Sequence, residues 1–490
     1  MVHFETVAPE QAGISPLWLE GFLDSIERQG LMVHSVMLLR HGKLVMEGYY
    51  APFRREDKHR MYSVSKTFVA TAIGMLQDEG RISLEDKVVA YFPDLLPPHV
   101  HPWLADATIR DLLRMATPHN RASYMENWTD CVRTFFDTQP GHPPGTVFNY
   151  DTAGTYVLNV IVERVTGKPF LDYMKAKGLA ALGFSEDAWC VKAPEGYSWG
   201  GSGVMCTPRD LALLGQIYLN GGVFNGKRLL SEDYVREATS FQIDNRTDGG
   251  YDLISGNGYG YQIWLLKGGG YAFCGMGGQL AICLPQHHLL FVSTADLQGM
   301  KSDYAGLYGA LYREVVDKIG QDVPPVDREA NRRLQARLGA LACKPAPAPG
   351  GAQLSPRCWG TTYRLNCNPM GIRSFKLLKE ADHGVFEYEK ADGVKRIVFG
   401  FDQYHIGVFP ETHYFGDTIG KPAGRPYRCM AAARVPEANK LVLRVYVADD
   451  YFGSMTATFA FKGLEVGVHM SKTAEWFLDE YQGFAGGMAE

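Results

Sequence analysis

A proline-rich run divides this chain of 490 residues into two stretches with different patterns. The run reads Cys343-Lys344-Pro345-Ala346-Pro347-Ala348-Pro349-Gly350-Gly351, and it favours a semi-rigid spacer because closely spaced prolines interrupt both helices and sheets. Helical and strand patterns alternate before the run, whereas mainly strand patterns follow it. We therefore predict an α/β domain over residues 1–325, a helical and Pro-Ala linker over 326–356, and an all-β domain over 357–490.

The first stretch predicts helices packed around a sheet. Ser15-Pro16 is a helix-start signal, and the amphipathic pattern after it reaches Gln29. Two β-rich runs near the start, 33–40 and 44–50, predict a hairpin, and two late runs, 279–284 and 289–294, predict further strands. The middle third of the chain is mostly helical in pattern. Both ends of this stretch therefore supply strands, with helices between them.

The stretch after the proline-rich run predicts about eight strands. Asp392-Gly393 favours a hairpin turn between residues 385–390 and 395–400. Residues 440–448 form a dense β run, and residues 455–461 alternate apolar and polar side chains. These strands predict a small antiparallel barrel or sandwich. Such a domain could line or cap a cleft in the first domain or form a homodimer contact, and its residues do not separate these roles.

Composition excludes several classes of partner. The formal net charge of −5 and the lack of a basic run interleaved with aromatics argue against nucleic acid. No segment reaches the roughly 18 apolar residues of a membrane span. The first six residues, Met1 to Thr6, lack the features of a signal peptide. We therefore expect a cytoplasmic protein without a nucleic-acid or membrane partner.

The cysteines and histidines predict neither a disulfide framework nor a metal site. The nine cysteines are odd in number and form no C-x-x-C pair, which favours reduced thiols. His99, His101 and the pair His287-His288 lie in turn-like sequence without a cluster of carboxylates. We therefore expect no metal and no cofactor.

Ser63 and Lys66 are the candidate reactive pair. They stand three residues apart in Arg60-Met61-Tyr62-Ser63-Val64-Ser65-Lys66-Thr67-Phe68, at what reads as the start of a buried helix. That spacing places both side chains on one face of a helix, one turn apart. A lysine amine beside a serine hydroxyl can lower the pKa of the hydroxyl or take its proton. The pattern also occurs by chance in surface helices, so other sequence blocks must support it.

Several ordered blocks further along supply that support. They are Glu79 to Val88 with Tyr91-Phe92-Pro93, Thr108 to Met115, Pro144 to Gly154, Val162 to Gly167 and Gly200 to Ala212. Between residues 9 and about 318 the chain resembles the serine β-lactamase-like superfamily of class C type, which includes esterases, D-aminopeptidases and hydrolases of aminohexanoate oligomers. The resemblance implies an antiparallel sheet flanked by helices, a helical subdomain beside it, and a reactive cleft between them.

The resemblance also implies the roles of three catalytic residues. Ser63 would be the nucleophile, and Lys66 would shift its proton. Tyr150 falls where the family places the tyrosine of its Y-x-N motif. An ammonium beside this phenol favours its phenolate, which could act first as base and then as acid. This predicts a serine hydrolase that acts on an amide or ester of a small molecule or short peptide through an acyl-enzyme.

The substrate side departs from the family pattern. Thr152 stands where β-lactamases have asparagine. Its single hydroxyl can accept a hydrogen bond from Lys66, but threonine has no side-chain amide to present to a substrate carbonyl. The third family motif, Lys or His two residues before Gly, has two placements. Lys267-Gly268-Gly269 reads as a turn, so we favour Phe273-Cys274-Gly275.

The favoured placement assigns the remaining site residues. Phe273 would replace the usual cation, Cys274 would form a small pocket wall, and Thr152 and Gly275 would complete the substrate side. The backbone N–H groups of Ser63 and Met276 would form the oxyanion hole. Without a cation at residue 273, neutral amides or esters fit better than penicillins.

A second serine and three other activities stay open. Ser198 lies in Gly196-Tyr197-Ser198-Trp199-Gly200, which matches the nucleophile elbow of α/β-hydrolases but lacks its strand and helix context. We expect Ser198 near the pocket rim instead. The alternatives to the serine hydrolase are a β-lactamase or D-Ala-D-Ala carboxypeptidase, an acyltransferase using the same acyl-enzyme, and a non-catalytic binding protein on this fold.

Overall fold

The structure is a computed structural model. It describes residues 2–246, 256–300, 303–322, 325–345, 352–401, 403–412, 424–449, 451–474 and 477–490. Most of the predicted proline-rich spacer, residues 346–351, lies outside the described residues.

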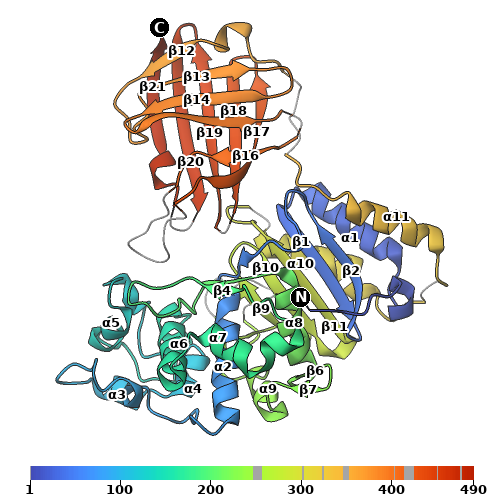
Figure 1. Cartoon of the computed structure of the whole chain (residues 1–490), viewed down its shortest axis with the longest axis vertical. Helices are drawn as coiled ribbons and strands as arrows, with labels where there is room; N and C mark the ends of the chain where they lie inside the picture. The colour runs from blue at the N-terminus through green and yellow to red at the C-terminus, as the bar shows by residue number, and fades with distance from the viewer. Residues whose placement is uncertain are drawn as a thin grey trace.

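A six-stranded antiparallel sheet forms the centre of the N-terminal part (Figure 1). Its order is β2-β1-β11-β10-β9-β8. The predicted hairpin is β1 and β2, and the two predicted late strands are β10 and β11. The bounds are β1 (Val33–Arg40), β2 (Lys43–Tyr49), β8 (Trp264–Leu265), β9 (Tyr271–Gly275), β10 (Gln279–Leu284) and β11 (Leu289–Ala295). The two ends of this part of the chain therefore meet in one sheet, as the sequence predicts.

Helices cover both faces of this sheet. On one side α1 (Pro16–Gln29) packs against α10 (Asp303–Glu314) and α11 (Arg328–Gly339). On the other side α8 (Pro208–Leu219) packs on β10 and β11, and α2 (Val64–Asp78) packs on β9. Because α2 is buried on nearly all sides, the residues at its start are fixed between the sheet and the helical subdomain.

The helical subdomain surrounds the other side of α2, which packs against α6 and α7. Its helices are α3 (Pro102–Asp106), α4 (Ile109–Leu113), α5 (Cys131–Asp137), α6 (Thr152–Thr166), α7 (Phe170–Met174) and α9 (Glu232–Ala238). Two small sheets join it to the rest, β3 (His59–Arg60) with β5 (Val204–Cys206) and β4 (Trp189–Cys190), and β6 (Val223–Phe224) with β7 (Lys227–Arg228). Strand β3 leads directly to Ser63.

The C-terminal part is a nearly closed antiparallel barrel (Figure 1). Its strands are β12 (Thr362–Leu365), β13 (Ser374–Lys379), β14 (Gly384–Lys390), β15 (Gly393–Phe399), β16 (His405–Phe409), β17 (Tyr427–Glu437), β18 (Lys440–Ala448), β19 (Phe452–Lys462), β20 (Glu465–Ala474) and β21 (Gly483–Ala489). They form one ten-stranded sheet with β15 and β16 at its ends. Gly400, which follows β15, is bridged to β17, the neighbour of β16, where Ala433 N–H donates to the Gly400 carbonyl over 2.8 Å.

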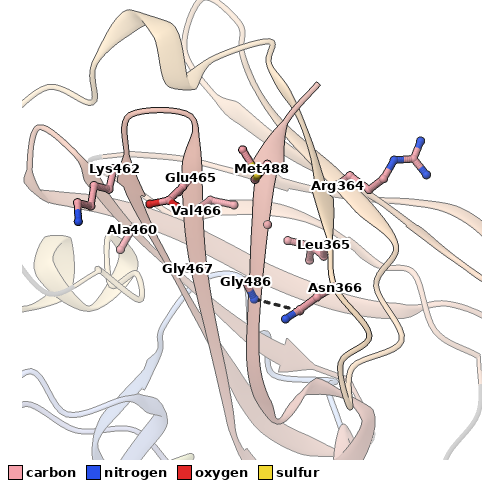
Figure 2. A pocket seen from close by; sticks show the side chains of 11 residues that line it. Arg364, Leu365, Asn366, Ala460, Lys462, Glu465, Val466, Gly467, Gly486 and Met488 are labelled. Atoms are coloured by element: carbon pink, nitrogen blue, oxygen red, sulfur yellow. Dashed lines mark hydrogen bonds between the residues drawn. The ribbon is translucent and has the colours of Figure 1, made fainter.

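The barrel has more strands than the approximately eight that its sequence predicts. Strand β12 has 4 residues, and β21 contains several glycines, so both carry weak strand signals. The outer wall has a groove of about 700 Å³ where Gly467 of β20 pairs with Gly486 of β21 (Figure 2). The residues lining this groove all belong to the barrel, and Ser63 is not among them.

The helix that the sequence predicts within the linker is α11, and it packs on the N-terminal part. Leu334 and Leu338 of α11 are buried in the same cluster as α1. The chain then passes the segment that follows β2, where Cys343 N–H donates to the Ala51 carbonyl over 2.9 Å. All nine cysteines are free thiols. No helix among the described residues is long and apolar enough to cross a membrane.

Candidate active site

Ser63 stands at the N-terminus of α2, where the chain turns sharply out of β3. The preceding residue, Tyr62, has a φ of 45°, a left-handed conformation that aromatic residues rarely adopt. Met61 N–H donates to the Val204 carbonyl of β5 over 2.8 Å, which fixes the entry to the turn. The turn sets the Ser63 hydroxyl beside the first turn of α2.

Lys66 contacts Ser63 as the three-residue spacing predicts. Its Nζ donates to Ser63 Oγ over 2.9 Å and to the Gly201 carbonyl oxygen over 2.7 Å. The lysine side chain is 1% exposed. Its amine is therefore held in a dry environment with two oriented acceptors, the arrangement needed to move a proton to or from Ser63.

Tyr150 is a further neighbour of Lys66, whose Nζ lies 5.0 Å from the centre of the Tyr150 ring. The ring stacks on Trp264 with 5.4 Å between centroids. Burial raises the pKa of Tyr150 well above its ordinary value, while a side-chain hydrogen bond with Ser63 acts in the opposite direction. The resting phenol is therefore neutral, unlike the phenolate that a neighbouring ammonium alone would favour.

Gly275, at the end of β9, packs directly against the turn before Ser63. A Cβ built on Gly275 would lie 2.2 Å from the Met61 carbonyl oxygen and 3.2 Å from the Val64 nitrogen. Tyr304 of α10 donates from its hydroxyl to the Gly275 carbonyl over 2.6 Å. Met276 follows at once, so its N–H and that of Ser63 come from adjacent segments. Neither N–H donates a hydrogen bond to another described residue.

The family model described as Beta-lactamase matches residues 20–311, which is more than half of the chain. The chain belongs to the beta-lactamase family. This confirms the resemblance inferred from the blocks between residues 9 and 318.

One curated relative, the 6-aminohexanoate-dimer hydrolase of Paenarthrobacter ureafaciens, is 33% identical over 216 residues. That match covers 41% of this chain and 55% of the relative, so the chain spans about half the length of this relative.

Among solved structures, a putative 6-aminohexanoate-dimer hydrolase from Bacillus anthracis has a TM-score of 0.53 and 20% identity, covering 66% of this chain and 89% of that chain. A putative beta-lactamase from Bacteroides dorei has a TM-score of 0.51 and 20% identity, covering 61% and 97%. Because each of these two structures is only 20% identical to this chain, the similarity shows a common fold.

Two of the predicted substrate-side residues take packing positions in this family member. Thr152 is the first residue of α6, and its Cγ2 lies 2.4 Å from the position of a Cβ built on Gly201. Phe273 is fully buried, with its ring 5.2 Å from that of Tyr218 on α8. In the favoured placement of the family motif, the position of the cation is thus occupied by an apolar side chain in the core.

The remaining motif residues lie on or beside β9. Cys274 is partly buried, and its surroundings raise the pKa of its thiol, which keeps the thiol neutral. Lys267-Gly268-Gly269, the alternative placement of the motif, lies in the turn between β8 and β9, where both glycines have positive φ. This turn is at the far end of β9 from Gly275.

The alternative nucleophile Ser198 lies inside a loop. It is 1% exposed, its hydroxyl accepts a hydrogen bond from Lys192 Nζ over 3.1 Å, and its N–H donates to Glu163. Asn159 donates to its carbonyl over 2.7 Å. These hydrogen bonds hold Ser198 in a buried position within the loop, whereas its sequence led us to expect a position at the pocket rim.

Sequence reasoning missed Asp151 and the Gly201 carbonyl. Asp151 caps α6 by accepting from Ala153 N–H over 2.8 Å, and it also accepts from Thr117 Oγ1 over 2.9 Å. Burial raises the pKa of Asp151 to about 6, against these bonds and the charge of Lys66, which lower it. Its position directly before an apolar helical run is a typical N-cap signal, whereas no sequence signal marks the Gly201 carbonyl.

Proposed function

We propose that this chain is a serine hydrolase that cleaves an amide or ester of a small molecule or short peptide through an acyl-enzyme on Ser63. The contact between Lys66 and Ser63 is the observation that carries the proposal. A buried amine 2.9 Å from a hydroxyl at a helix N-terminus is suited to activating that hydroxyl. Hydrolases among its family relatives support the same class.

The proposed reaction has two halves that use the same proton carriers. In its reactive form the pair consists of a neutral Lys66 amine beside the neutral Tyr150 phenol, so the amine can accept a proton. Ser63 Oγ bonds to the substrate carbonyl carbon while its proton passes to this Lys66–Tyr150 pair. The pair returns this proton to the leaving amine or alcohol as the bond to the carbonyl carbon breaks. A water then loses a proton to the pair and attacks the ester, and Ser63 Oγ regains the proton. The N–H groups of Ser63 and Met276 would stabilise the oxyanion in both halves.

A serine-reactive fluorophosphonate tests the nucleophile. Labelling should be lost in Ser63→Ala and kept in Ser198→Ala, because only Ser63 contacts the buried amine of Lys66 in this way. Intact-mass measurement would locate the adduct, and circular dichroism would confirm that both variants fold. Labelling that persists in Ser63→Ala would overturn the proposal.

The substrate class needs a separate panel. The 6-aminohexanoate dimer represents a small amide, and a p-nitrophenyl ester represents an activated ester. Nitrocefin turnover at an ordinary enzymatic rate would instead favour a β-lactamase, although the buried Phe273 supplies no charge for the carboxylate of a β-lactam. Transfer of the acyl group to an added amine or alcohol would favour the acyltransferase, and acylation without release would favour a non-catalytic binding protein.

A further inference from the structure

The barrel contacts the segment that carries the candidate nucleophile. One buried cluster combines Tyr62 and Phe53 from the N-terminal part with four barrel residues, Met430, Tyr446, Ala448 and Phe452. Met276, the second candidate oxyanion-hole residue, packs against the same cluster. Both segments of the candidate oxyanion hole therefore rest on the barrel.

Phe452, the first residue of β19, is the central barrel contact. Its ring centroid lies 5.0 Å from that of His34 on β1 and 5.0 Å from that of His59 on β3. The rings of Phe452 and Phe53 meet edge to face at 6.3 Å. Phe452 is 1% exposed. It thus fills a gap between the central sheet and the short strand that leads into Ser63.

Tyr451, which precedes Phe452 in the chain, contacts Arg60, the last residue of β3. The Arg60 guanidinium lies between two aromatic rings, 4.8 Å from Tyr62 and 5.5 Å from Tyr451. Arg60 also donates to the Ser202 carbonyl over 2.9 Å and to Ser202 Oγ over 3.0 Å. The preceding residue, Gly201, accepts from Lys66. Tyr451 and Phe452 therefore touch the supports of both Ser63 and Lys66.

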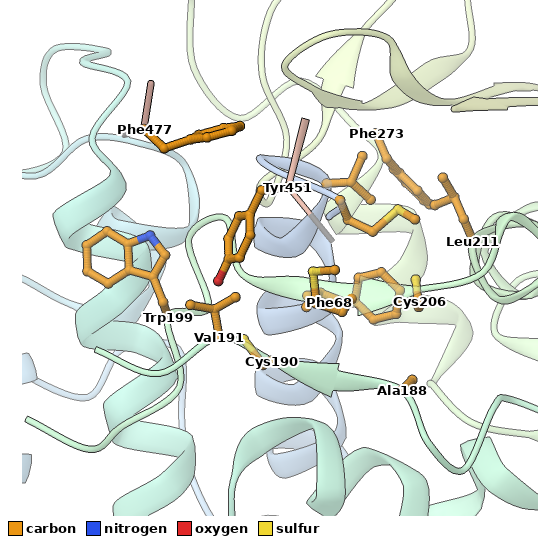
Figure 3. Close-up of a cluster of buried hydrophobic side chains, with 14 of the residues drawn as sticks. Phe68, Ala188, Cys190, Val191, Trp199, Cys206, Leu211, Phe273, Tyr451 and Phe477 are labelled. Carbon is orange, nitrogen blue, oxygen red and sulfur yellow. The ribbon is translucent and has the colours of Figure 1, made fainter. Parts of the chain in front are cut away.

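A second barrel segment reaches into the same region. Figure 3 shows Tyr451 and Phe477 beside Val191 and Trp199 of the N-terminal part, and all four belong to one buried cluster. An ion pair of 3.2 Å between Arg428 of β17 and Asp57 fastens the barrel to the loop before β3. Several independent contacts thus hold the two parts together around β3.

The conformation of Tyr62 explains why this support matters. A left-handed conformation strains an aromatic residue, and it persists only when the surroundings of that residue hold it. Tyr62 is 2% exposed, its ring lies 4.8 Å from the Arg60 guanidinium, and its side chain belongs to the buried cluster that contains Phe452. Without the barrel contact the chain could relax at Tyr62, which would turn the Ser63 N–H and hydroxyl away from Met276 and Lys66.

We infer that Phe452 is a positioning residue, through which the barrel holds Tyr62 in its left-handed conformation and thereby sets the geometry of Ser63. This inference rests on the proposed function, because it takes Ser63 to be the nucleophile. It assigns to the barrel a part in the acylation step.

The test measures the rate of acylation of the full chain by a fluorophosphonate at a temperature where circular dichroism shows every variant folded. Phe452→Ala should slow acylation by about ten-fold or more, because small displacements of a nucleophile are costly. The matched control is Phe484→Ala, since Phe484 lies on the outer wall of the barrel and is 73% exposed. Its acylation rate should equal that of the wild type.

A double-mutant cycle separates positioning from a general loss of stability. Glycine adopts positive φ without strain, so Tyr62→Gly removes the need for external support at this position. The effect of Phe452→Ala on acylation should then be much smaller in the Tyr62→Gly background than in the wild type. Equal effects in both backgrounds, or a wild-type rate for Phe452→Ala, would overturn the inference. Labelling that persists in Ser63→Ala would instead overturn the proposed function.

Discussion

Gly275 and Met61 are in such close contact that only glycine fits at residue 275. The Cβ of any other residue would meet the Met61 carbonyl oxygen at 2.2 Å. Backbone atoms lie on both sides of this contact, so a larger residue must push β9 away from the start of α2. The close approach of two backbones is what places Met276 beside Ser63.

Gly275→Ala should therefore reduce acylation by about one hundred-fold while the protein remains folded, because it displaces Met276, whose N–H we propose as an oxyanion-hole donor. Fluorophosphonate labelling kinetics and circular dichroism would measure the two effects. Gly309→Ala is the matched control, since Gly309 lies in α10 and a Cβ built there meets nothing within 4 Å. Acylation of Gly275→Ala at the rate of the control would contradict the assignment of Met276.

A second prediction concerns the ion pair that joins β2 to α8. Arg209 donates from Nε and Nη2 to the two carboxylate oxygens of Glu47, each over 2.7 Å, and both side chains are 10% exposed. Burial raises the pKa of Glu47, but the hydrogen bonds from Arg209 and Tyr49 outweigh it and the pKa is lowered overall. The pair therefore stabilises the fold above the unfolded pKa of glutamate, and that stability is lost as pH falls through the lower folded value.

Glu47→Gln should lower the free energy of unfolding by about 3 kcal/mol at pH 7.5, because it leaves a buried guanidinium without its charged partner. The loss should be smaller at about pH 3, because the pair contributes less stability once the pH falls below the unfolded pKa of glutamate, about 4.3. Urea denaturation at the two pH values would measure it. Glu5→Gln serves as control, because the Lys43–Glu5 pair is exposed and worth little. A loss that does not change with pH would exclude the ionic origin.

Local patterns in the sequence were sufficient to predict that Ser63 and Lys66 lie in contact. The spacing of Ser63 and Lys66 fixes their relation within one turn of helix, whatever surrounds them. The turn-like sequence around Lys267 likewise separates it from the strand that ends at Gly275. These predictions succeed because each depends on only a few consecutive residues.

Contacts between distant segments could not be predicted in this way. Phe452 meets His34 and His59 only because the barrel docks on the N-terminal part, and no local pattern encodes that docking. The neutral state of Tyr150 has the same origin, since it depends on burial beneath Trp264. Sequence motifs thus identify reactive groups, whereas tertiary packing sets their protonation and exact placement.

The third prediction concerns Asp151, whose burial costs stability. Its pKa is about 6 in the folded chain against an ordinary value of 3.8, so the folded state binds the proton more tightly than the unfolded state. The wild type therefore loses stability as pH rises from about 4 to about 6. A difference of about two pKa units corresponds to about 3 kcal/mol.

Asp151→Asn should remove this cost while keeping the helix cap. The asparagine oxygen can still accept from Ala153 N–H, and its amide can donate to Thr117, whose hydroxyl can reverse its role. Relative to the wild type, the variant should gain up to about 3 kcal/mol more at pH 8 than at pH 4, as measured by urea denaturation. Asp130→Asn is the control, because Asp130 also caps a helix but is partly exposed. If the stability difference between variant and wild type is the same at both pH values, the carboxylate of Asp151 is not the source of the cost.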